Sequence, residues 1–332
     1  MRCGRACASR GDRVYNLPMR LLFVLTAMAG ATPFLFAADL RLGIVGTDTS
    51  HATAFASVLN DPAHKNHIPG ARIVAAYKGG SADLKESSER VDKYAEELRS
   101  KYNVEIVPDI ATLLTKVDAV LLESVDGRPH LAQFREIAKG GKPVFIDKPL
   151  ASTLADARAI AKIAKESNIR WFSASSLRFS DGMPALRLEG LNGVMAWGPG
   201  PMEAHHQLDL TWYGIHTVET LYTLMGPGCV EVTRTFAVDA EVVTGKWKDG
   251  RVGTIRLLRP YSAFGATAFS PKVIKSSEKD FYTGYVGLLK EIVVFFQGGK
   301  APVDEAETME MFAFMDAAQR SREAGGVPMA LR

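Results

Sequence analysis

Cysteine is scarce in this sequence, and two of the three cysteines lie near the amino terminus. These two are Cys3 and Cys7, and the third is Cys229. If the amino-terminal segment is removed, Cys229 remains alone and cannot form a disulfide within the chain. The stability of the fold must then come from packing.

The sequence also lacks the composition of a disordered chain or of a polytopic membrane protein. Hydrophobic residues make up 47% and charged residues 23% of its 332 residues, which are ordinary values for globular proteins. A chain of this length is too long for one hydrophobic core, because cores usually stop growing beyond about 250 residues. We therefore expect two globular domains of α/β structure.

The first 38 residues differ from the rest of the chain. Their apolar run, residues 21–31, is followed by the small residues Ala37 and Ala38. It is preceded by five arginines, which are Arg2, Arg5, Arg10, Arg13 and Arg20. This order is typical of a secretory signal peptide, and a retained membrane anchor is the alternative. We predict a signal peptide over residues 1–38 and an exported, periplasmic protein with no integral membrane segment after cleavage.

An excess of positive charge is absent once this segment is set aside. Residues 1–38 carry five arginines and one acid, Asp12, whereas the whole chain has a formal net charge of +3. The remaining residues therefore carry a net charge of −1. A basic chain would have suggested nucleic acid or acidic lipid as a partner, and this charge gives no reason to expect either.

Short apolar runs alternate with helical patterns from residue 40 to residue 175. Apolar runs typical of buried strands cover residues 40–45, 72–77, 119–123, 143–146 and 170–175. Apolar residues at helical spacing lie between them, at residues 51–59, 88–101, 129–139 and 153–167. This alternation requires right-handed crossovers and a parallel sheet covered on both faces. The prediction is a Rossmann-like, doubly wound parallel sheet over residues 39–176.

The pattern changes after residue 176. Longer strand-rich segments cover residues 230–243 and 246–258, and an amphipathic helix is expected at residues 285–296. No internal repeat or low-complexity linker separates the two halves. We therefore predict a second domain over residues 177–332, an α+β open sheet that binds substrate and packs tightly on the first domain.

The turn after the first strand lacks two of the glycines of a dinucleotide-binding fingerprint. Asp48 and His51 stand where the second and third glycines belong. Backbone amides at such a turn bind pyrophosphate, which the Asp48 carboxylate would repel. Thr49 and Ser50 could also simply cap the following helix. The candidate cofactor-binding residues of this turn are Gly43, Gly46, Thr47, Thr49, Ser50 and His51.

The second strand lacks the acidic residue that binds the ribose of NAD. Tyr77 is followed by Lys78, and an ammonium group cannot accept hydrogen bonds from ribose hydroxyls. Lys78 could instead pair with a 2′-phosphate, which favours NADP over NAD. Solvation at the surface is the alternative role for this side chain.

Lys148 and His216 are the candidates for chemistry. Lys148 follows an apolar run, at the carboxyl end of a predicted strand, where open α/β sheets bind their ligands. There it can donate hydrogen bonds to a substrate hydroxyl. His216 lies in a predicted helix, and an imidazole titrates near neutrality, as a general base requires. A structural role is the alternative for a single histidine.

Taken together, these residues resemble the Gfo/Idh/MocA oxidoreductase family, which includes glucose-fructose oxidoreductase and inositol dehydrogenases. The resemblance covers essentially everything after residue 38. It rests on residues 43–51 and on two short motifs, Asp147-Lys148-Pro149 in place of the family's Glu-Lys-Pro and Gly214-Ile215-His216. Arg178-Phe179 and residues 299–321 are also similar to the family.

The resemblance implies an oxidoreductase that transfers hydride from a CH–OH group of a sugar or cyclitol to bound NADP or NAD. The catalytic residues would be Lys148, His216 and Tyr213. The cofactor would contact the first turn, Lys78, Ser124, His130 and Lys148. The substrate, a small carbohydrate or polyol, would contact Arg178, His206, Asp209 and Trp212. A homo-oligomer is left open, and no metal is expected.

Two departures from the family keep other functions open. The family has an aspartate four residues before its histidine, whereas Trp212 stands there in this chain, with Tyr213 or Asp209 as nearby substitutes. The leader also lacks the paired arginines of a pathway that exports folded proteins. One alternative is a carbohydrate-binding protein without redox activity. The other is a metal-dependent lyase or hydrolase, with donors from His205, His206, Asp209 and His216.

Overall fold

The computed structural model describes residues 38–278 and 281–332. The predicted leader therefore lies outside the described residues, apart from its last residue, Ala38. Among the described residues, no helix is long and apolar enough to cross a membrane. Export and leader cleavage stay predictions.

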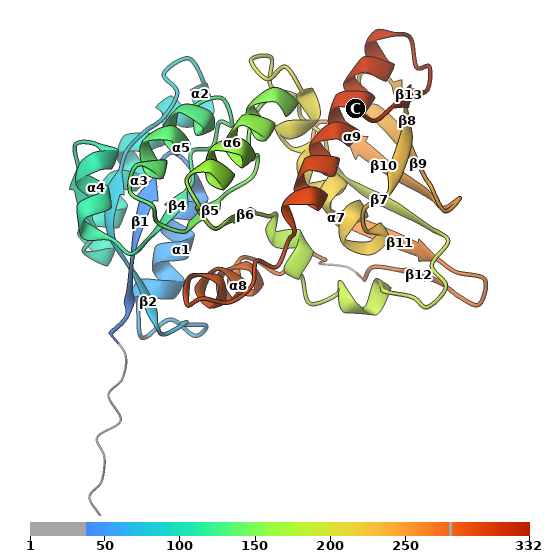
Figure 1. The fold of residues 1–332 in the computed structure, drawn as a ribbon. Helices are drawn as coiled ribbons and strands as arrows, with labels where there is room; N and C mark the ends of the chain where they lie inside the picture. Colours follow the sequence, from blue (N-terminus) through green and yellow to red (C-terminus); the bar gives the residue numbers. More distant parts are fainter. Residues whose placement is uncertain (1–37, 279–280) are drawn as a thin grey trace, which may run out of the picture. The chain divides into compact units, whose positions relative to one another are not determined.

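Six parallel strands form the first sheet, in the order β3-β2-β1-β4-β5-β6 (Figure 1). They are β1 (Leu40–Val45), β2 (Ala71–Tyr77), β3 (Glu105–Val107), β4 (Ala119–Leu122), β5 (Val144–Ile146) and β6 (Trp171–Ser173). This order is that of a doubly wound sheet. Five of these strands were predicted. No pattern in the sequence indicated β3, because this strand has three residues and only one of them is buried.

Helices cover both faces of this sheet. On one face α4 (Ile110–Lys116), α5 (His130–Ala138) and α6 (Leu154–Glu166) pack against alternate strand residues such as Val120 and Val144. On the other face α1 (Ser50–Asn60) and α3 (Val91–Tyr102) pack against the intervening residues, among them Leu121 and Phe145. A short helix, α2 (Lys85–Ser88), precedes α3.

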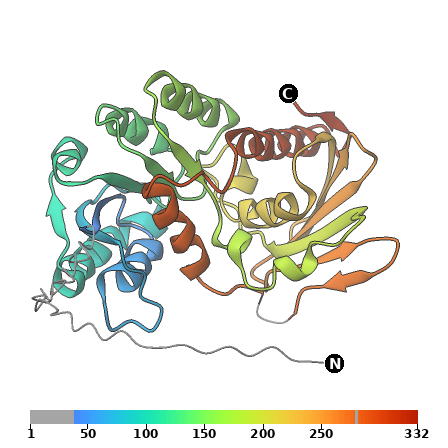
Figure 2. The ribbon, with the colours of Figure 1, turned by 60° about the horizontal axis from the view of Figure 1, so that its bottom comes forward.

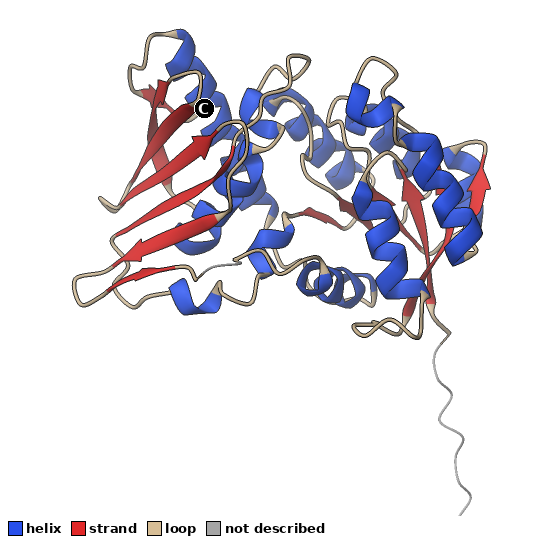
Figure 3. Cartoon of the chain, turned by 180° about the vertical axis from the view of Figure 1, so that it is seen from behind, coloured by secondary structure: helices blue, strands red, loops and turns tan. Residues whose placement is uncertain are grey.

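The second half contains a seven-stranded, mostly antiparallel sheet in the order β12-β11-β7-β10-β9-β8-β13. Its strands are β7 (Gly193–Pro199), β8 (Cys229–Phe236), β9 (Ala240–Trp247), β10 (Val252–Leu258), β11 (Gly265–Phe269), β12 (Ile274–Ser276) and β13 (Met329–Ala330). Two helices, α7 (Gly214–Met225) and α9 (Glu305–Glu323), lie on one face of it (Figure 3). The predicted fold, a Rossmann-like domain followed by an α+β open-sheet domain, is confirmed.

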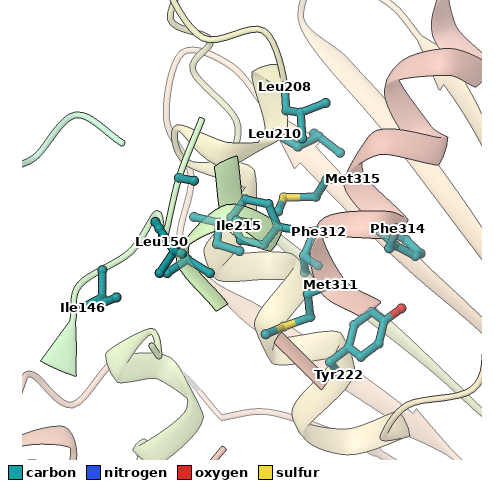
Figure 4. Close-up of a cluster of buried hydrophobic side chains, with 14 of the residues drawn as sticks. Ile146, Leu150, Leu208, Leu210, Ile215, Tyr222, Met311, Phe312, Phe314 and Met315 are labelled. Carbon is teal, nitrogen blue, oxygen red and sulfur yellow. The ribbon is translucent and has the colours of Figure 1, made fainter. Parts of the chain in front are cut away.

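One hydrophobic core runs through both halves. It joins Ile146 and Leu150 of the first half to Ile215 of α7 and to Phe312 and Met315 of α9 (Figure 4). These side chains are almost completely buried. The continuity of this core agrees with the absence of a linker in the sequence and fixes the carboxyl end of the first sheet against α7.

The packing of α8 (Val286–Phe296) does not follow the predicted boundary at residue 176. Leu288, Leu289 and Ile292 of this late helix pack with Leu42 of β1 and Phe55 of α1 in the first-sheet core. Figure 2 shows α8 beside the helices of the first half. A single domain boundary in the sequence cannot predict that the chain returns to the first domain. The local pattern of residues 285–296 indicates a helix but does not indicate which sheet that helix covers.

The return of α8 to the first core predicts unequal effects of two substitutions on the same helix. Leu289 is fully buried, whereas the side chain of Val294 is about half exposed. We expect Leu289→Ala to lower the free energy of unfolding by about 2–5 kcal/mol, because it leaves a cavity in the first core. Val294→Ala should change it by no more than about 0.5 kcal/mol. Urea unfolding measures both, and equal effects would contradict this packing.

Candidate functional site

Three strand ends meet at the carboxyl edge of the first sheet. β1 leads into the turn before α1, β4 is followed by Glu123, and β5 is followed by Asp147 and Lys148. Because Leu122 pairs with Ile146, Glu123 and Asp147 leave neighbouring strands at the same level. Ligands of open α/β sheets bind at such an edge.

A cavity of about 180 Å³ lies where this edge meets the second half. Its polar lining from the edge consists of Ser50, His51 and Lys148. From the second half it receives Tyr213 and His216 of the α7 region. The other lining residues are Ser176, Leu177, Tyr261, Phe264, Tyr282 and Tyr285. We call this the inner cavity.

A second cavity of about 270 Å³ shares part of that lining. The shared residues are Ser50, His51, Lys148, Tyr213 and Tyr261. The second cavity extends along the turn before α1 and the loop after β4, and it is also lined by Thr49, Glu86, Arg90, Val125, Pro201 and Trp212. We call this the outer cavity.

His216 is oriented by a hydroxyl group and not by a carboxylate. Its Nδ1 lies 2.7 Å from Oγ of Ser175, a residue that sequence reasoning did not select. The ring also packs edge-on against Phe264 and Tyr213, with centroids 5.5 and 5.9 Å away. Burial, the ammonium group of Lys148 and His51 together lower the pKa of His216 well below its ordinary value. The imidazole is therefore neutral at pH 7.

The turn before α1 directs its acid inwards. The Asp48 carboxylate is fully buried and accepts hydrogen bonds from Oγ of Ser87 (2.6 Å) and from the backbone amide of Val125 (3.2 Å). Burial raises the pKa of Asp48, and these two hydrogen bonds oppose the rise. Asp48 lines neither cavity. The repulsion of phosphate expected from the sequence is thus weakened by the direction of this side chain.

Several candidate cofactor residues hold the loops of the edge together. Gly46 has a φ of +99°, and a Cβ there would lie 2.3 Å from the amide nitrogen of Ser124. Thr47 donates its amide to Lys78 O (2.8 Å) and its hydroxyl to Val91 O (2.9 Å). The buried ring of His130 lies between the carbonyl oxygens of Ser124 and Leu150. These contacts define the shape of the edge.

Two further cofactor candidates lie away from the cavities. Gly43 is inside β1, where a Cβ would lie 2.6 Å from the side chain of Leu113, so it permits the close packing of α4. Lys78 pairs with Asp92 at the surface, with Nζ 2.8 Å from the carboxylate. Close packing of α4 accounts for Gly43, and a cofactor role for this glycine stays a prediction. A contact of Lys78 with a 2′-phosphate stays a prediction.

Arg178 and Asp209 are committed to internal ion pairs and not to the cavities. Arg178 pairs with Glu219 of α7 and Glu307 of α9, both at 2.7 Å. Asp209 pairs with Arg322 and with Arg234, whose side chain is fully buried. The structure gives the charged groups of both residues protein partners, and their predicted substrate contacts stay predictions.

His206 also faces the protein and not the inner cavity. Its Nε2 lies 3.1 Å from Asp126 of the first half, and its Nδ1 lies 2.9 Å from Oγ1 of Thr211. Trp212, the fourth predicted substrate residue, packs against the His206 ring with centroids 5.3 Å apart and lines the outer cavity. His206 therefore joins the two halves of the chain.

The metal donors predicted from the sequence do not assemble. His205 pairs with Glu203 at the surface, and His206, Asp209 and His216 each have the separate partners given above. Instead, the side chains of His51, Glu123 and Asp147 offer ligand atoms that all lie within 4.8 Å of one another. Sequence reasoning placed Glu123 at the end of a strand without a role. An acid directly after a buried apolar run was the available signal.

The fold and this edge define a Rossmann-type protein whose candidate site lies between the first sheet and α7. Residues 40–174 match the Gfo/Idh/MocA oxidoreductase family, described as an oxidoreductase family with an NAD-binding Rossmann fold. The match covers less than half of the chain and includes residues 43–51 and Asp147-Lys148-Pro149, two of the segments on which the resemblance rests. No curated protein matches the chain by sequence.

Solved structures share the fold of both halves. A myo-inositol dehydrogenase from Lactobacillus casei in complex with NAD(H) and myo-inositol is 17% identical, with a TM-score of 0.70 over 89% of this chain and 97% of that one. A myo-inositol 2-dehydrogenase from Lactobacillus plantarum is 14% identical, with a TM-score of 0.71 over 89% and 100%. A probable dehydrogenase from Thermotoga maritima is 20% identical, with a TM-score of 0.71 over 88% and 99%. At sequence identities this low, the structural similarity shows a shared fold and nothing further.

The bridge between Asp126 and His206 predicts a pH-dependent stability. Burial alone would raise the pKa of Asp126, but hydrogen bonds from His206, Arg128 and Ser81 lower it far below its ordinary value. Because the folded pKa is the lower one, the stabilisation is complete above the unfolded pKa of about 3.9 and is lost as the pH falls towards the folded value.

We therefore expect Asp126→Asn to lower the free energy of unfolding by about 3–5 kcal/mol at pH 7. The difference in free energy of unfolding between this variant and the wild type should stay constant down to about pH 5 and become smaller below about pH 4. Asp118→Asn removes an exposed pair with Arg41 and should change the stability by less than about 1 kcal/mol. Urea unfolding from pH 3 to 8 measures both variants. A gap that stays constant down to pH 3 would contradict the assigned pKa direction.

Proposed function

We propose that this protein is a nicotinamide-dependent oxidoreductase that acts on a CH–OH group of a small polyol, such as a sugar or cyclitol. The observation that carries the proposal is the inner cavity, whose lining includes both Lys148 and His216 and is rich in hydroxyl groups. Four tyrosines and two serines contribute to that lining. Tyrosine rings with polar tips suit a ligand that has both hydroxyl groups and C–H faces.

The outer cavity suits the phosphates and the nicotinamide of the cofactor. It is lined by Thr49 and Ser50 at the amino terminus of the 11-residue helix α1, where backbone amides favour an anion. Arg90 lines the same cavity and supplies a guanidinium group. The inward direction of Asp48 leaves its carboxylate out of both linings. When bound, the nicotinamide would accept the hydride from the carbinol carbon.

The protein's own residues would orient the substrate and remove its proton. Lys148 would donate a hydrogen bond to the reacting hydroxyl group, and Nε2 of His216 would accept the hydroxyl proton. Oγ of Ser175 already accepts a hydrogen bond from the amide of Leu177. If Nδ1 of His216 donates to this oxygen as well, Nε2 is left unprotonated and can act as a base. Tyr213 would bound the substrate on the α7 side.

Two parts of this proposal rest on the sequence alone. A preference for NADP over NAD follows only from Lys78 and the missing acid after β2. Export follows only from residues 1–38. Both can be tested independently of the chemistry, by titration with the two dinucleotides and by locating the protein in its cells of origin.

The outer cavity predicts a specific contribution of Arg90 to cofactor affinity. We expect Arg90→Gln to weaken binding of the preferred dinucleotide about tenfold or more, because a hydrogen bond to a charged group contributes roughly 1.5–3 kcal/mol. Arg99→Gln is the control, since Arg99 lies on the same helix and pairs with Glu96 at the surface. Quenching of tryptophan fluorescence can report binding, because Trp212 lines the cavity. Equal affinities of the two variants would contradict this placement.

The inner cavity predicts that His216 is the base. We expect His216→Asn to lower the turnover of a polyol by about 10²-fold or more and to leave dinucleotide affinity unchanged. His64→Asn is the control, because His64 lies in the loop after α1, outside both cavities. Nicotinamide reduction across a panel of inositols and hexoses measures the effect.

The result that would overturn the proposal is equally specific. If the wild type reduces no dinucleotide with any polyol but binds a polyol by calorimetry, the protein is a carbohydrate-binding member of the fold without redox activity. If His216→Asn reduces the dinucleotide as fast as the wild type, the base is another residue.

A further inference from the structure

A buried group of three side chains lies at the carboxyl edge, beneath the cavities. Glu123 follows β4, Asp147 follows β5, and His51 lies in the first turn of α1. Their ligand atoms all lie within 4.8 Å of one another. They come from three separate segments of the sequence, and the parallel sheet brings them together.

Glu123 is the member of this group whose carboxylate lacks partners in the protein. Its side chain is fully buried, and neither of its carboxylate oxygens has a hydrogen-bond partner. An unpaired polar group in the protein interior costs free energy, and an unpaired charge costs considerably more. Burial and the neighbouring charge of Asp147 raise the pKa of Glu123 well above its ordinary value. The protein alone therefore gives this carboxylate no compensation beyond the nearby charge of Lys148.

His51 and Asp147 are close together but are not aligned for a hydrogen bond. His51 Nδ1 lies 2.7 Å from Asp147 Oδ2, yet this nitrogen and the second oxygen, Oδ1, both remain without a hydrogen-bond partner. The two side chains are thus close enough for both to be ligands of one metal ion. The three residues thus contribute four buried atoms that could bind a metal ion and that have no hydrogen-bond partner.

We propose that His51, Glu123 and Asp147 bind one divalent metal ion of the Zn²⁺ or Mn²⁺ type. One imidazole nitrogen suits Zn²⁺, and the two carboxylates suit Mn²⁺ and provide two negative charges to balance the ion. Three protein ligands leave a coordination position open. Because His51 lines both cavities, that position would face the bound ligand, and the ion could hold a substrate hydroxyl or carboxylate there.

The proposal is independent of the redox chemistry, because it can be tested without dinucleotide or polyol. The purified full-length protein is stripped with a chelator, and Zn²⁺, Mn²⁺ and Mg²⁺ are titrated separately by calorimetry. Thermal unfolding is followed in parallel. We expect one equivalent of Zn²⁺ or Mn²⁺ to bind and to raise Tm, since an ion that binds only the folded state stabilises it.

Two variants locate the site, and one serves as the control. Glu123→Gln and His51→Gln should each weaken binding by more than about 100-fold, because even partners behind the ligands typically contribute 10–100-fold. His51→Gln is the safer of the two for folding, since the His51 side chain is partly exposed. His205→Gln is the matched control at a surface histidine beside a glutamate, and its affinity should equal that of the wild type.

Three results would overturn the metal site. The first is the absence of stoichiometric binding of any of the three ions to the wild type. The second is binding that Glu123→Gln and His51→Gln leave unchanged, which would place the ion elsewhere. The third is a rise in Tm on addition of the ion that is as large for Glu123→Gln as for the wild type, because the stabilisation would then not come from this site.

Discussion

The meeting of two acids at the ends of neighbouring parallel strands is the constraint on which the site depends. Leu122 and Ile146 pair in the sheet, so Glu123 and Asp147 leave it side by side. Short hydrogen bonds hold both residues in place, from the Glu123 amide to Val45 O and from the Asp147 amide to Leu122 O. These contacts fix the backbone from which both buried carboxylates project. Every other charged group of the edge must therefore be arranged around two fixed, buried carboxylates.

The position of α7 follows from the core that both halves share. Ile215 and Val218 of this helix pack into a hydrophobic cluster that also contains Ile146 and Leu150 of the first half. This packing brings His216 and Lys148 into the lining of one cavity, although they are 68 positions apart in the sequence. A second connection is polar, because His206 reaches Asp126. The cavity is thus bounded by elements whose separation is fixed by packing, as a site that must orient a small ligand requires.

The sequence predicted the parts of the fold that depend on local pattern. Buried strands and the turn before α1 could be predicted because apolar runs and motifs stand in short segments. The candidates Lys148, His216, Ser50 and Tyr213, named from such motifs, all line the inner cavity, and their roles stay predictions. The sequence did not predict contacts between segments that are far apart along the chain. α8 packs on the first sheet from the far end of the sequence, and Ser175 meets His216 across 41 residues. The sequence also did not predict that Gly43, Arg178 and Asp209 lie against Leu113, Glu219 and Arg234, because these partners stand on other elements.

Trp212 stands where the resemblance implies an aspartate, and the negative charges of the site lie elsewhere. The resemblance to the family predicted a carboxylate on the α7 side, next to the histidine. In this structure the histidine of α7 has a hydroxyl partner, and the carboxylates lie on the sheet side, next to His51. Lys148 interacts with both groups, because its charge lowers the pKa of His216 and opposes the rise in the pKa of Glu123. The ammonium is therefore compensated from the sheet and not from the helix, which leaves His216 a neutral imidazole beside a cation. An imidazole in that environment gains a proton reluctantly, so any chemistry at this cavity depends on how strongly the sheet carboxylates are neutralised.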